Sequence, residues 1–242
     1  MDEGDVKGAI RLICSTDIVA EASPTTFQQL LPKHPPAPAD KRAPAPITWE
    51  PLLAYVDQVL GAIKSFPPDS SGGPDGLRPQ RLKALTEKQV RGTLLASLTN
   101  LTNFSLAGKT PEWVRPYFFG ASLLAIAKKD GGVRPIAVGV TLRRLAGKVT
   151  CRSVSADCVE LLKPRQFGVG VKGGAEALVH GARRYLDNLP TNHMFVKLDF
   201  SNAFNSIRRD AMREALPFML QTFSVMSTRR TARQRHSSSA SM

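Results

Sequence analysis

The first residue that calls for a chemical explanation is Asp199, which follows the mainly apolar residues 195–198. A carboxylate is costly to bury without a partner. If residues 194–200 form a buried strand, Asp199 needs a cation, a cage of hydrogen-bond donors or a metal ion. A small polar turn and Phe204 come next, and residues 207–216 have helical spacing. Asp199 is therefore the leading candidate for cation or metal binding.

A second candidate site is a predicted β-hairpin with basic residues near its tip. Residues 118–127 have the composition of a buried strand, an Asp-Gly pair favours a tight turn, and residues 134–138 can form the returning strand. Lys128 and Arg134 then lie where a lysine point charge and an arginine fork would suit a polyphosphate. A charged turn that is simply solvated fits the same residues, and both interpretations stay open.

Two glycine-rich loops could bring backbone N–H groups close to an anion. Residues 70–77 combine two glycines with Pro-Asp-Gly, which predicts a tight turn; the Gly-Lys-Ser/Thr of a phosphate-binding P-loop does not follow. Residues 163–174 lead into a helix predicted over residues 175–186, and such a loop can bind an anion through free N–H groups. An ordinary turn is the alternative for each loop.

Composition points to the kind of partner. The chain has 242 residues with 33 Lys and Arg against 20 Asp and Glu, a net charge of +13. This excess favours nucleic acid or another anionic surface, with a basic protein that has no such partner as the alternative. Cys14, Cys151 and Cys158 lack the spacing of a disulfide framework or a zinc site, so we expect reduced thiols in an intracellular protein. No apolar run approaches the ~20 residues of a membrane span, and an acidic N-terminus argues against a signal peptide.

Helical spacing of apolar residues predicts most of the elements that must position these sites. A helix capped by Thr48 runs to about residue 66, residues 81–106 form one long helix or two, and Gly108 marks their exit. These helices are apolar on one side, so we expect them to form the core.

A further helix can be capped by Thr141 and continue to about residue 154. Its basic side chains lie on other faces than its apolar residues. This basic face suits a nucleic-acid backbone, and a solvated helix face is the alternative. The basic residues are Arg143, Arg144, Lys148 and Arg152.

The ends of the chain differ from its middle. Residues 1–31 alternate short apolar and polar patches, which predicts small helices. Residues 32–46 are rich in proline and alanine, which predicts an extended linker, either a plain spacer or a ligand of an SH3-type domain. Residues 221–242 are rich in serine and arginine, so we expect a disordered basic tail that binds polyanions loosely.

Five motifs in order resemble the reverse transcriptases of non-LTR (LINE-type) retrotransposons, over roughly residues 45–216. Each motif alone is a weak signal, whereas five in the family's order are specific. Residues 33–35 also resemble the leader that precedes such domains. The motifs are Gly73-Pro74-Asp75-Gly76-Leu77, Ile126 to Ile136, Leu142-Arg143-Arg144-Leu145, Gln166-Phe167-Gly168 and Val196 to Phe204.

The resemblance implies part of a right-hand polymerase fold, of the α+β class. Residues 47–190 would form a fingers-like region of helices and a hairpin. Residues 191–220 would begin the palm, with its first strand, its first helix and its first catalytic aspartate. The thumb and the catalytic hairpin of the palm would be missing.

The resemblance also implies roles for single residues. Asp199 matches the first catalytic and metal-binding aspartate, and the backbone carbonyl of Phe200 would be a further metal ligand beside the nucleotide. Phe204 matches the bulky residue that crowds the sugar 2′ position and favours deoxynucleotides, and Lys128 and Arg134 match residues that hold the incoming triphosphate. The residues that would approach template or primer are Gln166, Phe167, Gly168, Arg143 and Arg144.

The implied reaction is RNA-directed DNA synthesis, with an RNA template, a DNA primer and dNTP as partners. Such phosphoryl transfer uses two Mg²⁺ ions held by carboxylates. The family supplies the further carboxylates from an Asp-Asp hairpin, and no two aspartates are adjacent in this sequence. We therefore expect a truncated fragment that is inactive as a polymerase alone.

Two other interpretations stay open. The chain could be a non-catalytic remnant that binds nucleic acid through its basic residues. It could also be an unstable product without a function, because a palm without its central hairpin exposes strand edges and apolar helix faces. The sequence leaves the oligomeric state open.

Overall fold

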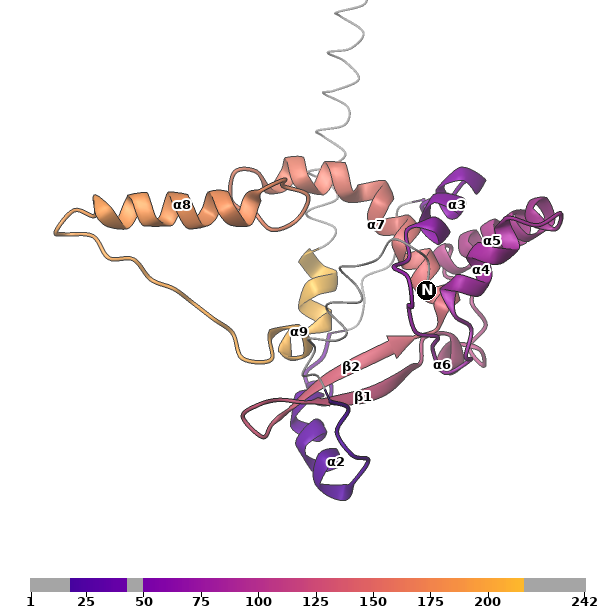
Figure 1. The fold of residues 1–242 in the computed structure, drawn as a ribbon, viewed down its shortest axis with the longest axis horizontal. Coiled ribbons are helices and arrows are strands. Elements are labelled where there is room, and N and C mark those ends of the chain that lie inside the picture. Colours follow the sequence, from indigo (N-terminus) through magenta and orange to yellow (C-terminus); the bar gives the residue numbers. More distant parts are fainter. Residues whose placement is uncertain (1–17, 43–49, 216–242) are drawn as a thin grey trace, which may run out of the picture.

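The computed structural model describes residues 18–42 and 50–215, which form an α+β arrangement of helices with one two-stranded antiparallel sheet (Figure 1). Helical residues 209–215 follow the last labelled element. In chain order the elements are α2 (Pro24–Leu30), the 3₁₀ helix η1 (Leu31–Lys33), α3 (Val56–Lys64), α4 (Pro79–Thr86), α5 (Arg91–Leu106), α6 (Arg115–Phe118), β1 (Ala121–Ala127), β2 (Val133–Gly139), α7 (Thr141–Leu162), α8 (Gly174–Asp187) and α9 (Ala203–Ser206).

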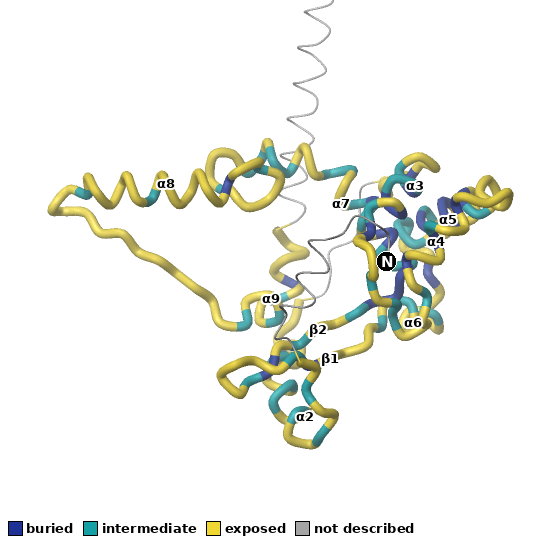
Figure 2. The backbone as a smooth tube through the Cα atoms, in the orientation of Figure 1, coloured by how far each residue is buried: buried dark blue, intermediate teal, exposed yellow. Residues whose placement is uncertain are grey.

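The core lies where α3, α4 and α5 pack against the first half of α7, and we call α3 to α6 with residues 141–150 the helical body (Figure 2). Side chains at helical spacing meet there, and burying each one fully contributes roughly 1.5–3 kcal/mol. Val59 and Ile63 retain no accessible surface. The buried hydrophobic residues of this cluster are Ala54, Val59, Ala62, Ile63, Phe66, Leu82, Leu95, Leu98, Leu145 and Val149.

Helix α3 begins later than the sequence predicts, at Val56. A side chain of α5 holds the residues before it in an extended form. The Asn103 Oδ1 accepts a hydrogen bond from the Ala54 N–H at 2.7 Å, and its Nδ2 donates to the Ala54 carbonyl at 3.1 Å. Both backbone groups of Ala54 are therefore engaged by a tertiary partner instead of a helical turn. The proposed cap, Thr48, lies outside the described residues.

The predicted helical stretch over residues 81–106 is divided into α4 and α5, which was one of the two alternatives. Gly108 has a φ of +70°, a left-handed conformation that ends α5 as predicted.

The β-hairpin is confirmed. Strands β1 and β2 pair from Ala121 with Gly139 to Ala127 with Val133, and Gly131 adopts a φ of +77° in the turn. The expectation of a buried strand is wrong, because in β1 only Ala125 is buried. The described sheet has two strands and lacks the layers that would cover both of its faces.

Helix α7 begins at Thr141 but is not capped by it. Val140 occupies the N-cap position, and the fully buried Thr141 hydroxyl instead donates a hydrogen bond to the Leu77 carbonyl. The helix continues to Leu162, beyond the predicted end near residue 154.

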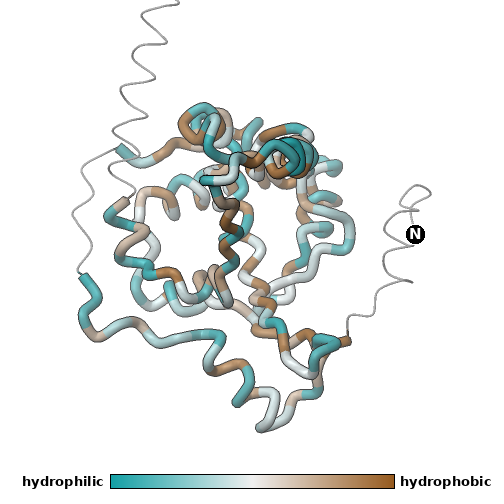
Figure 3. Tube along the Cα trace, turned by 90° about the vertical axis from the view of Figure 1, so that its left-hand side faces the viewer, coloured by the Kyte–Doolittle hydropathy of each residue, from teal (hydrophilic) through white to brown (hydrophobic). Residues whose placement is uncertain are grey.

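Residues 151–200, which we call the arm, extend away from the helical body (Figure 1). Gly174 is the buried residue of this arm, and the rest is exposed or half-buried. Hydrophobic residues lie along outer parts of the tube as well as near its centre (Figure 3). The apolar residues of the arm therefore remain largely uncovered by the described chain.

The prediction of a strand over residues 194–200 is wrong. This segment is exposed and has no regular secondary structure. A strand needs a neighbour for its backbone N–H and C=O groups, and no described strand pairs with this segment.

Across the part of the chain that the structure describes, none of the helices has both the length and the hydropathy required to cross a bilayer.

Candidate functional site

Two of the five motifs, the glycine loop and the start of α7, meet in space at the end of β2, and a third, Ile126 to Ile136, leads along β2 to this junction. The glycine loop of residues 70–77 lies directly on the end of β2. A Cβ atom on Gly73 would lie 2.7 Å from backbone atoms of Gly139 and Val140, so only glycine fits there. The Thr141 hydroxyl bond to Leu77 fastens the same loop to α7. The loop thus packs against both β2 and α7, and this tight packing explains why residue 73 is a glycine.

Two of the basic residues on α7 are engaged inside the helical body. Arg144 Nη1 donates to the Ser71 carbonyl at 2.6 Å, and Lys148 Nζ lies 3.3 Å from both the carbonyl and the hydroxyl of Ser65, the C-cap of α3. Both cations also lie over the Phe66 ring, at 5.3 and 4.8 Å from its centroid. Cations at a helix C-terminus and over an aromatic ring are stabilising. Arg144 therefore has a structural partner at the position predicted for template or primer.

Arg143, the other α7 residue of that predicted set, is placed differently. It is half-buried, and its guanidinium lies against Gly139 where a side chain would otherwise stand. Its Nε is buried without a hydrogen-bond partner among the described residues. Arg143 therefore keeps a charge at the junction that the described protein does not neutralise with an ion pair.

The hairpin tip presents its two predicted phosphate-binding residues to solvent. Lys128 and Arg134 are exposed, and strand alternation places them on the same face of the hairpin. Asp130 shapes the turn, because its Oδ1 accepts the Gly132 N–H at 3.0 Å. The geometry fits a polyphosphate clamp and a solvated turn equally, so this role stays a prediction.

The N-terminal segment contacts both the hairpin tip and the motif around Asp199. The sequence did not predict these contacts. Gln29 Nε2 of α2 lies 3.5 Å from the Gly131 carbonyl at the tip. A few residues later, the Lys33 carbonyl accepts a hydrogen bond from Asn202 Nδ2 at 3.1 Å. Both motifs therefore touch one short stretch of chain, although neither contact has a signal in the local sequence.

Asp199 and Phe200 lie in the exposed last segment of the arm, and Phe204 lies just beyond it in α9. Phe204 is 92% exposed, so no described residues form the pocket wall against which a nucleotide sugar would be crowded. The described residues contain no group of three or more His, Cys, Asp or Glu side chains placed to hold a metal. Asp199 alone does not fit a pair of Mg²⁺ ions, which need several carboxylate ligands.

Asp210 is the acid nearest to Asp199 in the sequence, and it already has other hydrogen-bond partners. It is buried, and Arg208 donates to it twice, through Nη2 at 2.7 Å and Nε at 3.1 Å. The N–H of Arg42 donates at 3.1 Å and that of Ala211 at 3.0 Å. The Arg208 hydrogen bonds, followed by the Arg42 N–H, hold the pKa of Asp210 well below its usual range.

Arg208 joins Asp210 to the proline-rich segment. Its Nη1 donates to Asp40 Oδ2 at 3.1 Å, and Asp210 and then Asp40 raise the pKa of the guanidinium. Arg42 also pairs with Glu214. We call residues 40–42 with 208–214 the clasp. Residues 34–42 are irregular, as expected of a proline-rich linker, but their end is docked here and is no free spacer.

The loop around Gln166 is organised by its own side chain. Gln166 Oε1 accepts the N–H groups of Gly168 and Val169, both at 2.9 Å, and its Nε2 donates to the Val169 carbonyl at 3.0 Å. The Phe167 carbonyl packs where a side chain on Gly174 would stand. The loop follows the 22 residues of α7, a length of about 33 Å at 1.5 Å per residue. It therefore lies far from the β2–α7 junction at the start of that helix.

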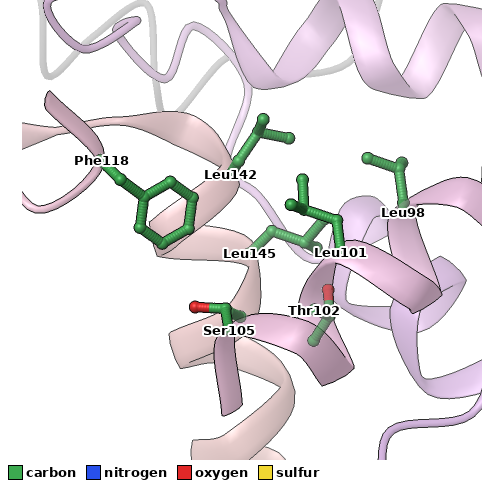
Figure 4. A pocket seen from close by; sticks show the side chains of 8 residues that line it. Leu98, Leu101, Thr102, Ser105, Phe118, Leu142 and Leu145 are labelled. Atoms are coloured by element: carbon green, nitrogen blue, oxygen red, sulfur yellow. The ribbon is translucent and has the colours of Figure 1, made fainter. Parts of the chain in front are cut away.

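A shallow apolar hollow lies between α5, α6 and the start of α7 (Figure 4). Phe118 points into it together with leucines of α5 and α7, and the enclosed space is too small for a water molecule. The hollow is a packing defect of the helical body and not a substrate pocket.

No protein-family model, no curated protein and no solved structure matches this chain. The candidate site is thus defined by its own residues.

Proposed function

We propose that this chain derives from a reverse transcriptase of the non-LTR type, with residues 47–190 as its fingers-like region and Asp199 as the palm carboxylate among the described residues. The observation that carries the proposal is the packing of the glycine loop on the β2–α7 junction. The loop around Gly73 is more than 60 positions from the end of β2 and the helix start at residues 142–145, and it packs on both; the hairpin motif leads along β2 to the same junction. Motifs of a common ancestor are expected to pack on one another in this way.

In that ancestry, the fingers would orient template and triphosphate, and two Mg²⁺ ions would activate the primer hydroxyl and hold the triphosphate. The described residues do not fit the metal pair, because Asp199 lacks companion carboxylates and Asp210 is held in the clasp. The remaining function of this chain is to bind nucleic acid through its basic groups. Lys128, Arg134 and Arg143 are the residues that we propose for contact with phosphates.

A paired assay tests this proposal. The purified chain and its Asp199→Asn variant are given an RNA template with a DNA primer, dNTP and Mg²⁺, and both primer extension and binding of the duplex are measured. We expect binding that weakens steeply with salt, and no extension by either protein. Extension that depends on Asp199 would show that the site is complete, and absence of binding at low salt would overturn the proposal.

The alternative is a nucleic-acid-binding protein whose surface lies on the arm and owes nothing to the fingers motifs. Exposed cations on the arm favour it, and they are not part of the β2–α7 junction. These residues are Arg152, Lys163, Arg165, Lys172, Arg183 and Arg184.

The two candidates differ in which cations matter. A Lys128→Ala/Arg134→Ala variant should weaken binding of a template–primer duplex in the first case, and an Arg183→Ala/Arg184→Ala variant should do so in the second. Each pair removes two exposed charges, so either variant serves as the control for the other.

A further inference from the structure

Two large aromatic side chains remain uncovered on α6 and the turn before it. Trp113 is 77% exposed and Tyr117 is 76% exposed. Aromatic residues of this size usually bury most of their area, since they carry a large apolar surface. Two aromatic side chains at this exposure are therefore available to a ligand.

The backbone that carries the pair is regular. The N–H groups of Val114 and Arg115 both donate to the Pro111 carbonyl, at 3.0 and 3.2 Å, so helical geometry begins before α6 itself. Residues four positions apart on a helix lie on the same face. Trp113 and Tyr117 are therefore neighbours on one surface.

Another side of α6 is anchored in the helical body. Phe118 points into the hollow lined by Leu142 and Leu145 (Figure 4). Its ring also packs edge-to-face on Phe119, with centroids 5.2 Å apart. Because α6 is held from within, the outward pair is presented on a fixed support.

Basic residues lie next to the pair in the sequence. Lys109 and Arg115 are exposed and lie within a few positions of Trp113, against the single acid Glu112. Arg143 lies at the same end of the hairpin, since its guanidinium rests on Gly139 at the end of β2 and β1 starts directly after α6. None of the three cations forms an ion pair with a carboxylate in the described ranges.

We propose that Trp113 and Tyr117 form a stacking surface for the bases of single-stranded nucleic acid, with the phosphates held by Lys109, Arg115 and Arg143. Stacking on aromatic side chains combined with a cationic border is how proteins hold single strands without reading sequence. This inference rests on the nucleic-acid affinity proposed above and assigns to it a base-binding surface that the sequence motifs do not contain.

Tryptophan fluorescence tests the surface directly. The chain has two tryptophans, so a Trp49→Phe variant leaves Trp113 as the one emitter. We expect a single-stranded oligothymidylate to quench this emission, because a stacked base lies on the indole ring. The same strand annealed to oligoadenylate should leave the emission almost unchanged, because its bases are already stacked on one another.

Affinity provides the second measurement. A Trp113→Ala/Tyr117→Ala variant should bind oligothymidylate about tenfold more weakly or worse, with an unchanged salt slope because no cation is lost. The matched control is Tyr55→Ala, which removes another exposed tyrosine at the start of α3 and should bind normally. Circular dichroism should report the same helix content for all three proteins.

The outcomes separate the two proposals. Undiminished binding by the Trp113→Ala/Tyr117→Ala variant, or binding that leaves the Trp113 emission unchanged, overturns the stacking surface and leaves the nucleic-acid affinity standing. Failure of the unmodified chain to bind any nucleic acid at low salt overturns both.

Discussion

The helical body and the arm are built from similar sequence patterns, but they differ in how far their apolar residues are buried. Both contain amphipathic helices. In the body the apolar side of α3 meets α5 and α7, and Val59 and Ile63 are completely buried. In the arm, Leu178 and Leu186 of α8 are about half exposed, and the tube of α8 is coloured as exposed over most of its length (Figure 2). An amphipathic pattern thus specifies a helix but not a partner for it.

The same contrast separates the motifs. Those in or next to the body are fixed by packing: Gly73 lies on Gly139, Arg144 donates to the Ser71 carbonyl of the glycine loop, and Lys148 is bound to the end of α3. Among the described residues, the motif around Asp199 is held at its far end, where Asn202 donates to the Lys33 carbonyl, and the clasp follows directly after it. The interior therefore organises the glycine loop and the start of α7 and leaves the motif around Asp199 open.

The largest difference is expected from a truncation in each region. Ile63→Ala removes a fully buried side chain of the body and should lower the free energy of unfolding by about 2–5 kcal/mol. Leu178→Ala on α8 removes a half-exposed side chain and should change it by less than about 0.5 kcal/mol. Urea unfolding followed by circular dichroism measures both. Equal losses would mean that the apolar side of α8 is covered in solution.

A second comparison uses glycines. Gly73→Ala places a methyl group 2.7 Å from backbone atoms of Gly139 and should cost about 1–3 kcal/mol in unfolding free energy, as overpacking does. Gly147→Ala, in the exposed interior of α7 with open space around it, should stabilise the protein by about 0.5–1 kcal/mol. Thermal unfolding of the two variants measures both effects. Changes in stability of the same sign would contradict the close approach of the glycine loop to β2.

A smaller effect is expected from the cations of α7. Lys148→Ala removes a contact with the end of α3 and with the Phe66 ring, and it should destabilise the body by about 1 kcal/mol. Lys163→Ala, at an exposed pair with Glu160, should cost only about 0.3–0.5 kcal/mol. If Lys148→Ala left stability unchanged but weakened binding of nucleic acid, the basic face of α7 would be a binding surface after all.

The most local effect is expected from the clasp. The pKa of Asp210 is lowered in the folded state, so its stabilisation is complete above the unfolded value near 3.9 and is lost as pH falls from there toward the folded value. At neutral pH, Asp210→Asn should speed hydrogen exchange in residues 202–214 and leave the body unaffected. On acidification below about pH 4, the unmodified chain should approach the variant. Hydrogen exchange measured by mass spectrometry tests this. Equal protection of the two proteins at neutral pH would show that the clasp does not stabilise residues 202–214.

Features that depend on residues close in sequence could be predicted, whereas features that depend on distant residues could not. The hairpin, its turn at Gly131 and the helices α5, α7 and α8 could be predicted, because turn preference and apolar spacing act within a few residues. The start of α3 could not, because Asn103 holds Ala54 from 49 positions away. The strand over residues 194–200 failed for a related reason: apolar composition favours a strand only where a neighbouring strand is present.

The same distinction holds for the candidate site. The sequence identified Lys128, Arg134 and Asp199 by residue type and order, and their chemical roles remain predictions. It contained no signal for the bond between Arg208 and Asp40, 168 positions apart, or for the exposure of Trp113 and Tyr117 on an anchored support.

By itself, the sequence determined that the long amphipathic segments become helices, where the hairpin turns and how much positive charge the chain carries, but not where α3 begins or α7 ends. The tertiary structure alone decided which cations are used internally, which carboxylate is paired and which apolar faces remain open. The reason is that backbone preference and net charge are properties of neighbouring residues and of composition, whereas partnership requires side chains that are distant in sequence to come within a few ångströms of one another.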